Sequence, residues 1–582
     1  MCFNYHTGAS DGPASVHLSG LVGHKGRFSC RLFCGVKGRR GIKEKRYYPA
    51  LLKPHPFDVP GSDHPDFDIL QINSAVNDYG EKLKYLLGAR SHTDYKRRRR
   101  DTGISQPKLL HGLLMHKRLS MSATLCGDTM HLTTLNLGDL FIPLWRGTLL
   151  CKGTDSVNDW PWAVLTDNIW TEHGRLVAEA RPYIPQSFDR PPRNIAEKVN
   201  SGYKSIEWQG YLFGLAPALL FGILPFEYWQ NYCKLVFAVR ILLQRSITRS
   251  QLQQAQKFLD EFTLEYELLY VQRRADRIHF VRPSVHSLIH LGLEVPRLGP
   301  PCLYSCWTME RTVGDLGREI RQPSNPYANL SERALLRAQV NSIKAMHPNL
   351  DPLDQITPPA GSLDLGDGYR LLPAKDRTPR YLVGYEASTL ESYLRNCKVG
   401  EGNELRQSYR VKIVRWARVL LPTAQIARSA WKEALKPLNK LRRSRCVKVS
   451  HRFLTKCFSI FGNLGLFYAQ VAIDGKLEFA EILFYFCIRM SSETQALAMV
   501  RLYSTPDADL YKQSMWTVYS VTSLYCEEGL RIIDIKSIIS VVSMQPWHPP
   551  GRDPDIDHWF VWEKIGLDVG VLGGSEENTE EN

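Results

Sequence analysis

The chain has 582 residues, with 74 Lys and Arg against 59 Asp and Glu, a net charge of +15, and 13 cysteines. Its hydrophobic content of 43% is typical of a globular protein and excludes a disordered one. A mean hydropathy of −0.27, with no apolar run near about 20 residues, argues against a membrane protein. No secretory leader is recognised and the cysteine count is odd, so we expect a reducing compartment. The positive excess favours a polyanionic partner, most simply nucleic acid.

The pattern along the chain changes from helical to strand-like. From about residue 70 to 270 the spacing of apolar residues predicts helices, most clearly in Glu227–Leu243 and Gln251–Tyr270. The Pro-, Gly- and Asp-rich stretch Pro348–Asp367 predicts a linker. Short strands, which predict a small barrel-like domain, follow in Glu478–Met490, Ala496–Tyr503, Thr517–Tyr525, Leu530–Met544 and Trp559–Leu572.

The positive charge is concentrated in two places. Residues 406–452 hold fourteen Lys and Arg and one acid, a net charge of +13. A helix from Thr423 to Lys436 would place its basic residues, four apart, on one face. Such a cluster is a phosphate-binding surface, a nuclear-localisation signal or only a solvated face. The DNA-binding candidates are Lys96, Arg97, Arg98, Arg99 and Arg100, and Arg428, Lys432, Lys436, Arg442 and Arg443.

Cysteine and histidine pairs mark a candidate metal site. Cys30 and Cys34 are spaced to bind one tetrahedral ion, but alone they are half a site. On a helix, His286 and His290 would share one face and complete a Cys2His2 zinc site. A local alternative joins the same histidines to the nearby pair Cys302 and Cys306. The competing interpretation of each pair is a buried small side chain or a core histidine.

Two acids flank these pairs. Asp11 precedes Cys30 by 19 residues, and Glu310 follows His290 by 20. Two-metal phosphoryl transfer needs convergent carboxylates, and these two acids would suit it.

Several motifs resemble those of CACTA (En/Spm-type) transposases, most of all the large families of mushroom-forming fungi. The longest is residues 299–330, which reads GPPCLYSCWTMERTVGDLGREIRQPSNPYANL and is similar to the closing motif of that group. Asp128-Thr-Met-His131, the segment Ser19-Gly20 with the cysteine pair, and Tyr47-Tyr-Pro-Ala50 resemble further motifs. The resemblance covers residues 9–345 and extends more loosely beyond.

The resemblance implies a core of the RNase H-like type, with a DDE triad that binds two Mg²⁺ (or Mn²⁺) ions. Asp11 would be the second acid and Glu310 the third. As in the related V(D)J recombinase core, Cys30, Cys34, His286 and His290 would share a structural Zn²⁺. The secondary candidates are Asp128, His131, Cys302 and Cys306. The family's first acid is not found upstream of Asp11, so we expect an N-terminally truncated and catalytically incomplete chain.

The expected fold class is α/β plus α: a partial RNase H-like catalytic core, interrupted by a large helical insertion and followed by a basic helical segment and a small β-rich domain. The expected units are 1–70 (core with the cysteine half of the zinc site), 71–280 (insertion), 281–345 (core-closing region), 346–405 (linker), 406–455 (basic helical segment) and 456–582 (β-rich domain). The expected function is transposase-like cleavage and transfer of DNA strands in the nucleus, with DNA as partner, a homo-oligomer as a further candidate and no membrane association. The alternative is a non-catalytic DNA-binding or chromatin-associated relic of a transposon.

Overall fold

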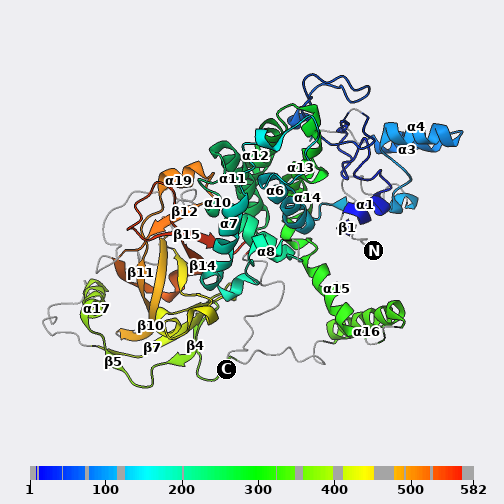
Figure 1. Cartoon of the computed structure of the whole chain (residues 1–582). Helices are drawn as coiled ribbons and strands as arrows, with labels where there is room; N and C mark the ends of the chain where they lie inside the picture. Colours follow the sequence, from blue (N-terminus) through cyan, green and yellow to red (C-terminus); the bar gives the residue numbers. More distant parts are fainter. Residues whose placement is uncertain are drawn as a thin grey trace, which may run out of the picture.

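A computed structural model describes residues 8–9, 12–41, 43–72, 78–113, 125–199, 202–320, 322, 324–347, 358–397, 411–450, 478–490, 493–524 and 529–566. Within them, helices dominate up to residue 346 and strands from residue 363 onward (Figure 1). The fold is therefore of a mixed α and β class, as expected. Among the described helices, none combines the length and the apolar character needed to cross a membrane.

The described part of the first half consists mainly of helices, with two strands of two residues each. The N-terminal elements are β1 (Gly8–Ala9), α1 (Gly12–Ser19), α2 (Ile69–Ile72), α3 (Tyr79–Leu87), α4 (His92–Thr102) and β2 (Leu125–Cys126). The helices that follow are α6 (Leu137–Trp145), α7 (Asp167–Glu179), α8 (Ile195–Lys198), α9 (Ser205–Gly210), α10 (Ala216–Leu219), α11 (Phe226–Leu242), α12 (Arg249–Tyr266), α13 (Pro283–Leu288), α14 (Leu291–Leu298), α15 (Trp307–Glu319) and α16 (Pro326–Met346).

Helices α11 and α12 confirm the two clearest helix predictions. Buried side chains of α11, among them Tyr228, Tyr232 and Leu235, recur every three or four residues. Thr248 caps α12, because its hydroxyl accepts the Gln251 N–H at 3.2 Å while the Gln251 side chain accepts the Thr248 N–H at 2.9 Å. The two helices pack against each other at the centre of the helical half (Figure 1).

The second half contains one large sheet in which eleven described strands are joined by antiparallel pairing. The strands run in the order β12-β15-β14-β9-β10-β7-β4-β3, while β11 joins β10 to β13, and β8 pairs with β7. The elements are β3 (Leu363–Gly366), β4 (Tyr369–Lys375), β5 (Arg380–Tyr381), α17 (Gly384–Cys397), β6 (Lys412–Ile413), β7 (Arg415–Leu420), β8 (Ile426–Arg428), α18 (Ala430–Glu433), β9 (Cys446–Val449), β10 (Glu478–Met490), β11 (Glu493–Leu502), α19 (Ala508–Gln513), β12 (Tyr519–Thr522), β13 (Leu530–Asp534), β14 (Ile538–Pro546) and β15 (His558–Glu563).

The sheet has hydrophobic clusters of its own, and part of the strand-rich half also joins the core of the helices. Trp547, Phe560 and Trp562 of the strand-rich half are buried in the same cluster as the helical side chains. Gly214 allows this packing, since a Cβ there would lie 2.4 Å from the Trp562 ring. The strand-rich half is therefore not a separate C-terminal appendage.

The structure differs from the expected organisation between residues 346 and 455. The expected basic helix from Thr423 to Lys436 is wrong, because only Ala430–Glu433 is helical and the flanking residues form β7, β8 and β9. The expected linker also contributes strands β3 and β4 to the sheet. The physical reason is burial: Val419 and Leu421, and likewise Val447 and Val449, are two residues apart, which is a strand period, and they face the sheet core.

The expected RNase H-like core in residues 1–70 stays a prediction. Within the described part of this region the only strand is β1, which pairs in parallel with β2, Gly8 opposite Leu125.

Candidate metal centre

Cys30, Cys34, His286 and His290 meet in one buried cluster, and their four ligand atoms all lie within 4.8 Å of one another. The Cys30 sulfur is 3.4 Å from His290 Nε2, and the Cys34 sulfur is 3.3 Å from His286 Nε2. The two Nε2 atoms are 3.3 Å apart. The cluster thus joins segments that are 252 to 260 residues apart.

Local structure turns each pair inward. The cysteines lie in a loop after α1, where the Phe33 N–H donates to the Cys30 carbonyl at 3.1 Å. Phe33 has a φ of 57°, and this left-handed turn brings Cys34 back toward Cys30. On the other side, Pro283 begins α13, His286 lies in its last turn, and His290 lies just before α14.

The four donors fit a tetrahedral zinc ion. With Zn–N bonds of about 2.0–2.1 Å and Zn–S bonds of about 2.3 Å, a tetrahedron has N–N edges of about 3.3 Å and N–S edges of about 3.6 Å. The observed N–N contact of 3.3 Å and N–S contacts of 3.3 and 3.4 Å are close to these edges. Both histidines present Nε2, and both thiols are of the soft type that zinc prefers.

The electrostatics of the cluster favour one thiolate. A hydrogen bond from the Cys34 thiol, and then the nearby histidines, hold the pKa of Cys30 well below its usual range. The same hydrogen bond and burial raise the pKa of Cys34 well above its usual range. Without an ion the pair would therefore share one proton, and a bound cation would remove it.

The alternative site with the second cysteine pair is not formed. The Cys302 thiol donates to the Gln244 carbonyl at 3.3 Å, and neither Cys302 nor Cys306 joins the metal cluster among the described residues. Both cysteines are buried, and Cys306 directly precedes α15. His55 and His64, which follow the cysteine pair in the chain, also lie outside the metal cluster. His55 contacts Arg273, and His64 contacts the Pro65 carbonyl.

A cavity of about 110 Å³ lies beside the metal cluster, and Asp128 and His131 line it together with Ser15. Asp128 is buried, and its carboxylate contacts His131 Nδ1 and accepts the Met130 N–H at 3.1 Å. Its oxygens thus already have partners at the head of a π-helical turn, His131–Asn136. The pair lines the cavity, and a role of either residue as a metal ligand stays a prediction.

Helix α14 begins directly after His290 of the metal cluster. Glu294, one turn after His290, is buried and accepts the Gly127 N–H at 3.0 and 3.1 Å through its two oxygens. Cys306 directly precedes α15. Burial, together with the charges of Asp128 and Glu310, raises the pKa of its thiol to about 12. Glu310 lies on the exposed face of α15. Asp11 lies outside the described residues, so its place as a metal ligand stays a prediction.

Buried charges that the sequence did not single out hold the cysteine loop. Arg39 is fully buried and donates to four carbonyls, those of Leu51, Ser62, His64 and Pro65. The Glu267 carboxylate accepts the N–H groups of Leu51 and Leu52 at 2.8 Å each. Arg39 and Glu267 bind backbone groups rather than particular side chains. They therefore form no sequence motif, and the apolar residues around them are the only sequence signal that they are buried.

The two basic clusters have different surroundings. On α4, Lys96 and Arg99 are exposed and have no acidic partner among the described residues, while Arg97, Arg98 and Arg100 pair with Asp94 or Asp101. In contrast, Arg442 donates to the carbonyls of Ile184, Pro185 and Asp189 at 2.6 to 2.9 Å. Arg443 lies over the Tyr183 ring at 4.3 Å, and Lys432 over Trp431 at 4.3 Å.

Comparison of the chain with protein-family models, with curated proteins and with solved structures found no match. The geometry of the sites therefore carries the functional argument.

Proposed function

We propose that this chain is a transposase-like protein of the two-metal type, which binds DNA through α4 and whose core is held together by a structural zinc ion. The observation that carries the proposal is the cluster of Cys30, Cys34, His286 and His290. It connects the segment that follows Asp11 to the segment that precedes Glu310, as such a core requires.

The surroundings of the cluster support the placement of the acids. Ser15, four residues after Asp11, lines the same cavity as Asp128. Cys306, four residues before Glu310, is buried close enough to Asp128 for that carboxylate to affect its pKa. Asp11 and Glu310 are thus each four residues from a residue, Ser15 or Cys306, that lies near the Asp128 carboxylate.

The zinc ion would act as a cross-link. Its four protein ligands leave no open position, which is the arrangement of a structural rather than a catalytic site. The chemistry of strand cleavage would belong to Mg²⁺ or Mn²⁺ ions at Asp11 and Glu310. A two-metal site of this type uses three acids, and two are identified in this sequence, so we expect the 582-residue chain to bind DNA without cleaving it.

Selection from a pool of random duplexes tests the proposal. We expect the full-length chain to enrich duplexes with a shared sequence and to bind them less tightly as salt rises. Enrichment of none would contradict the proposed function. Incubation of the enriched duplex with Mg²⁺ or Mn²⁺ then separates the two forms of the proposal, because cleavage that is lost in Glu310→Gln would show a complete active site.

The non-catalytic alternative is distinguished from a complete active site by the same variant. If the protein only binds DNA, Glu310→Gln leaves both the affinity and the selected sequence unchanged, and no cleavage occurs with either ion. An exposed glutamate elsewhere, Glu172, provides the matched control as Glu172→Gln.

A further inference from the structure

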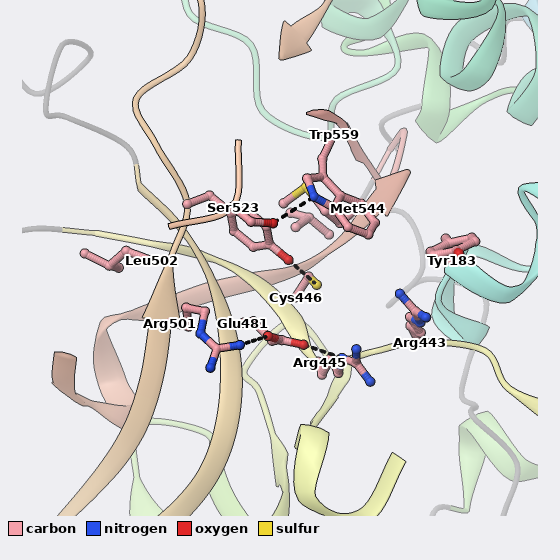
Figure 2. A pocket seen from close by; sticks show the side chains of 12 residues that line it. Tyr183, Arg443, Arg445, Cys446, Glu481, Arg501, Leu502, Ser523, Met544 and Trp559 are labelled. Atoms are coloured by element: carbon pink, nitrogen blue, oxygen red, sulfur yellow. Dashed lines mark hydrogen bonds and ion pairs between the residues drawn. The ribbon is translucent and has the colours of Figure 1, made fainter. Parts of the chain in front are cut away.

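A second cavity, of about 220 Å³, lies in the strand-rich half, away from the metal cluster. It is lined by ends of β9, β10, β11, β14 and β15 and closed on one side by Tyr183, which follows α7. Figure 2 shows Arg443, Arg445 and Arg501 with Glu481 along one side, and Trp559 and Met544 on the opposite side. The transposase-like proposal assigns this cavity no role.

The charged side of the cavity has a positive excess. Three arginines line it against one acid, Glu481, among the described lining residues. Glu481 pairs with Arg445 at 2.7 Å and with Arg501 at 3.5 Å. Burial raises the pKa of Cys446 to about 12, so this thiol adds no negative charge. An anionic ligand would therefore be attracted.

Two arginines keep unused donors. The Nε atoms of Arg443 and Arg501 are buried and have no hydrogen-bond partner among the described residues. The Arg443 guanidinium lies over the face of the Tyr183 ring at 4.3 Å, and a ring face offers no acceptor to N–H groups in the guanidinium plane. A phosphate group has several acceptor oxygens, and it would bind the guanidinium N–H groups that face the cavity.

The opposite side is aromatic and fixed in orientation. The Trp559 indole N–H donates to the Ser523 hydroxyl at 2.9 Å. The Trp559 ring lies 6.5 Å from the Tyr503 ring and 6.1 Å from the Tyr183 ring. Aromatic rings of this kind stack with planar bases, while arginines bind phosphate, and single-stranded nucleic acids are bound by that combination.

We propose that this cavity binds one nucleotide, with the phosphate at Arg443, Arg445 and Arg501 and the base against Trp559. A volume of about 220 Å³ is below the range of about 300–1,000 Å³ typical of sites for larger ligands. It suits one nucleotide unit and excludes a dinucleotide cofactor or a double helix. The nucleotide is either free or the 5′-phosphorylated end of a single strand. This proposal does not depend on the proposed transposase-like function.

Titration calorimetry of the full-length chain with deoxyadenosine monophosphate tests the site. We expect binding at least tenfold tighter than that of deoxyadenosine or of inorganic phosphate, because both halves of the ligand are used. Arg501→Gln should weaken binding about tenfold. Its side chain is 39% exposed at the rim, so the variant should fold, which far-UV circular dichroism checks. Arg443→Gln, deeper in the cavity, should have a similar effect.

The control is Arg531→Gln, an exposed arginine of β13 that does not line the cavity. It should leave the affinity unchanged. A 5′-phosphorylated hexamer of deoxyadenosine that binds more tightly than the mononucleotide would identify a strand end as the source, and equal or weaker binding would identify the free nucleotide. Three results would overturn the proposal: no binding of the monophosphate, equal binding by folded Arg501→Gln, or tighter binding of phosphotyrosine.

Discussion

Two polar links in this molecule join segments separated by nearly the same length of chain. The metal cluster connects the cysteine loop to the segment around α13 across 252 and 260 residues. Arg442 connects the sheet to the loop after α7 across 253 to 258 residues, through three backbone carbonyls. The first link uses four side chains of specific types, while the second uses one side chain and acceptors that every residue carries.

That difference decides what the sequence could predict. Cysteine and histidine pairs are rare, and their spacing is visible in the sequence, so the sequence predicts the metal cluster. A backbone carbonyl leaves no trace in the sequence, so Arg442 was predicted to contact phosphate, whereas the structure places it against protein carbonyls. The DNA contact of Arg442 therefore stays a prediction, while its contacts with protein carbonyls are part of the fold.

The largest expected effect is loss of the metal link. The purified chain should contain about one zinc ion, and Cys30→Ser should lose it and unfold at a markedly lower temperature, because metal binding is coupled to folding at such sites. Metal analysis by mass spectrometry and thermal unfolding measure the two effects. Cys151→Ser, at a half-buried cysteine outside the cluster, should keep both the zinc and the stability. A wild-type protein without zinc would contradict the metal centre.

The second largest effect concerns the carbonyl link. Arg442→Ala should lower the free energy of unfolding by about 4 kcal/mol, because it removes three charge-assisted hydrogen bonds and leaves carbonyls unpaired. Arg442→Lys should recover only part of this, since an ammonium group lacks the planar fork. Urea unfolding provides the measurement. If the alanine variant were as stable as the wild type but bound DNA weakly, Arg442 would contact DNA phosphate, as the sequence predicts, rather than stabilise the fold.

The same distinction explains which parts of the fold were predicted. Helices α11 and α12 follow periodic patterns and strand β10 is a run of apolar and aromatic residues, and the predicted segments match all three closely. The basic segment 406–452 was assigned the helical period because its cations recur every four residues. The buried pairs Val419 and Leu421, and Val447 and Val449, instead follow a strand period, and tertiary burial decides between the two.

A third link is sensitive to pH. Glu267 binds the N–H groups of Leu51 and Leu52 across 216 and 215 residues, and burial raises its pKa to about 7. A raised pKa means that the folded state binds more protons than the unfolded state between about pH 4.5 and 7. The stability from this group is therefore present at low pH and lost as the pH rises through that window, by at most about 3 kcal/mol.

The pH dependence is isolated by comparing the wild type with Glu267→Gln, which cannot titrate. The difference between their free energies of unfolding should decrease as the pH rises from 4.5 to 7 and then stay constant. Glu261→Gln, a partly exposed glutamate of α12, should leave the pH profile of the wild type unchanged. A difference that does not vary with pH would show that Glu267 ionises normally in the folded protein.

The smallest effect on stability, and the sharpest test of the comparison, concerns cations that form no link. Lys96 and Arg99 of α4 are exposed and unpaired among the described residues, so the double variant Lys96→Gln and Arg99→Gln should leave the unfolding temperature unchanged. DNA affinity should fall about tenfold, and the slope of log affinity against log salt should become shallower by about two, because two phosphate contacts are lost. Gel-shift titrations at several salt concentrations measure both quantities, with Lys257→Gln and Arg531→Gln combined as the matched control. If this control weakened binding as much as the α4 variant, the interaction would depend on net charge alone, and α4 would not be the DNA-binding surface.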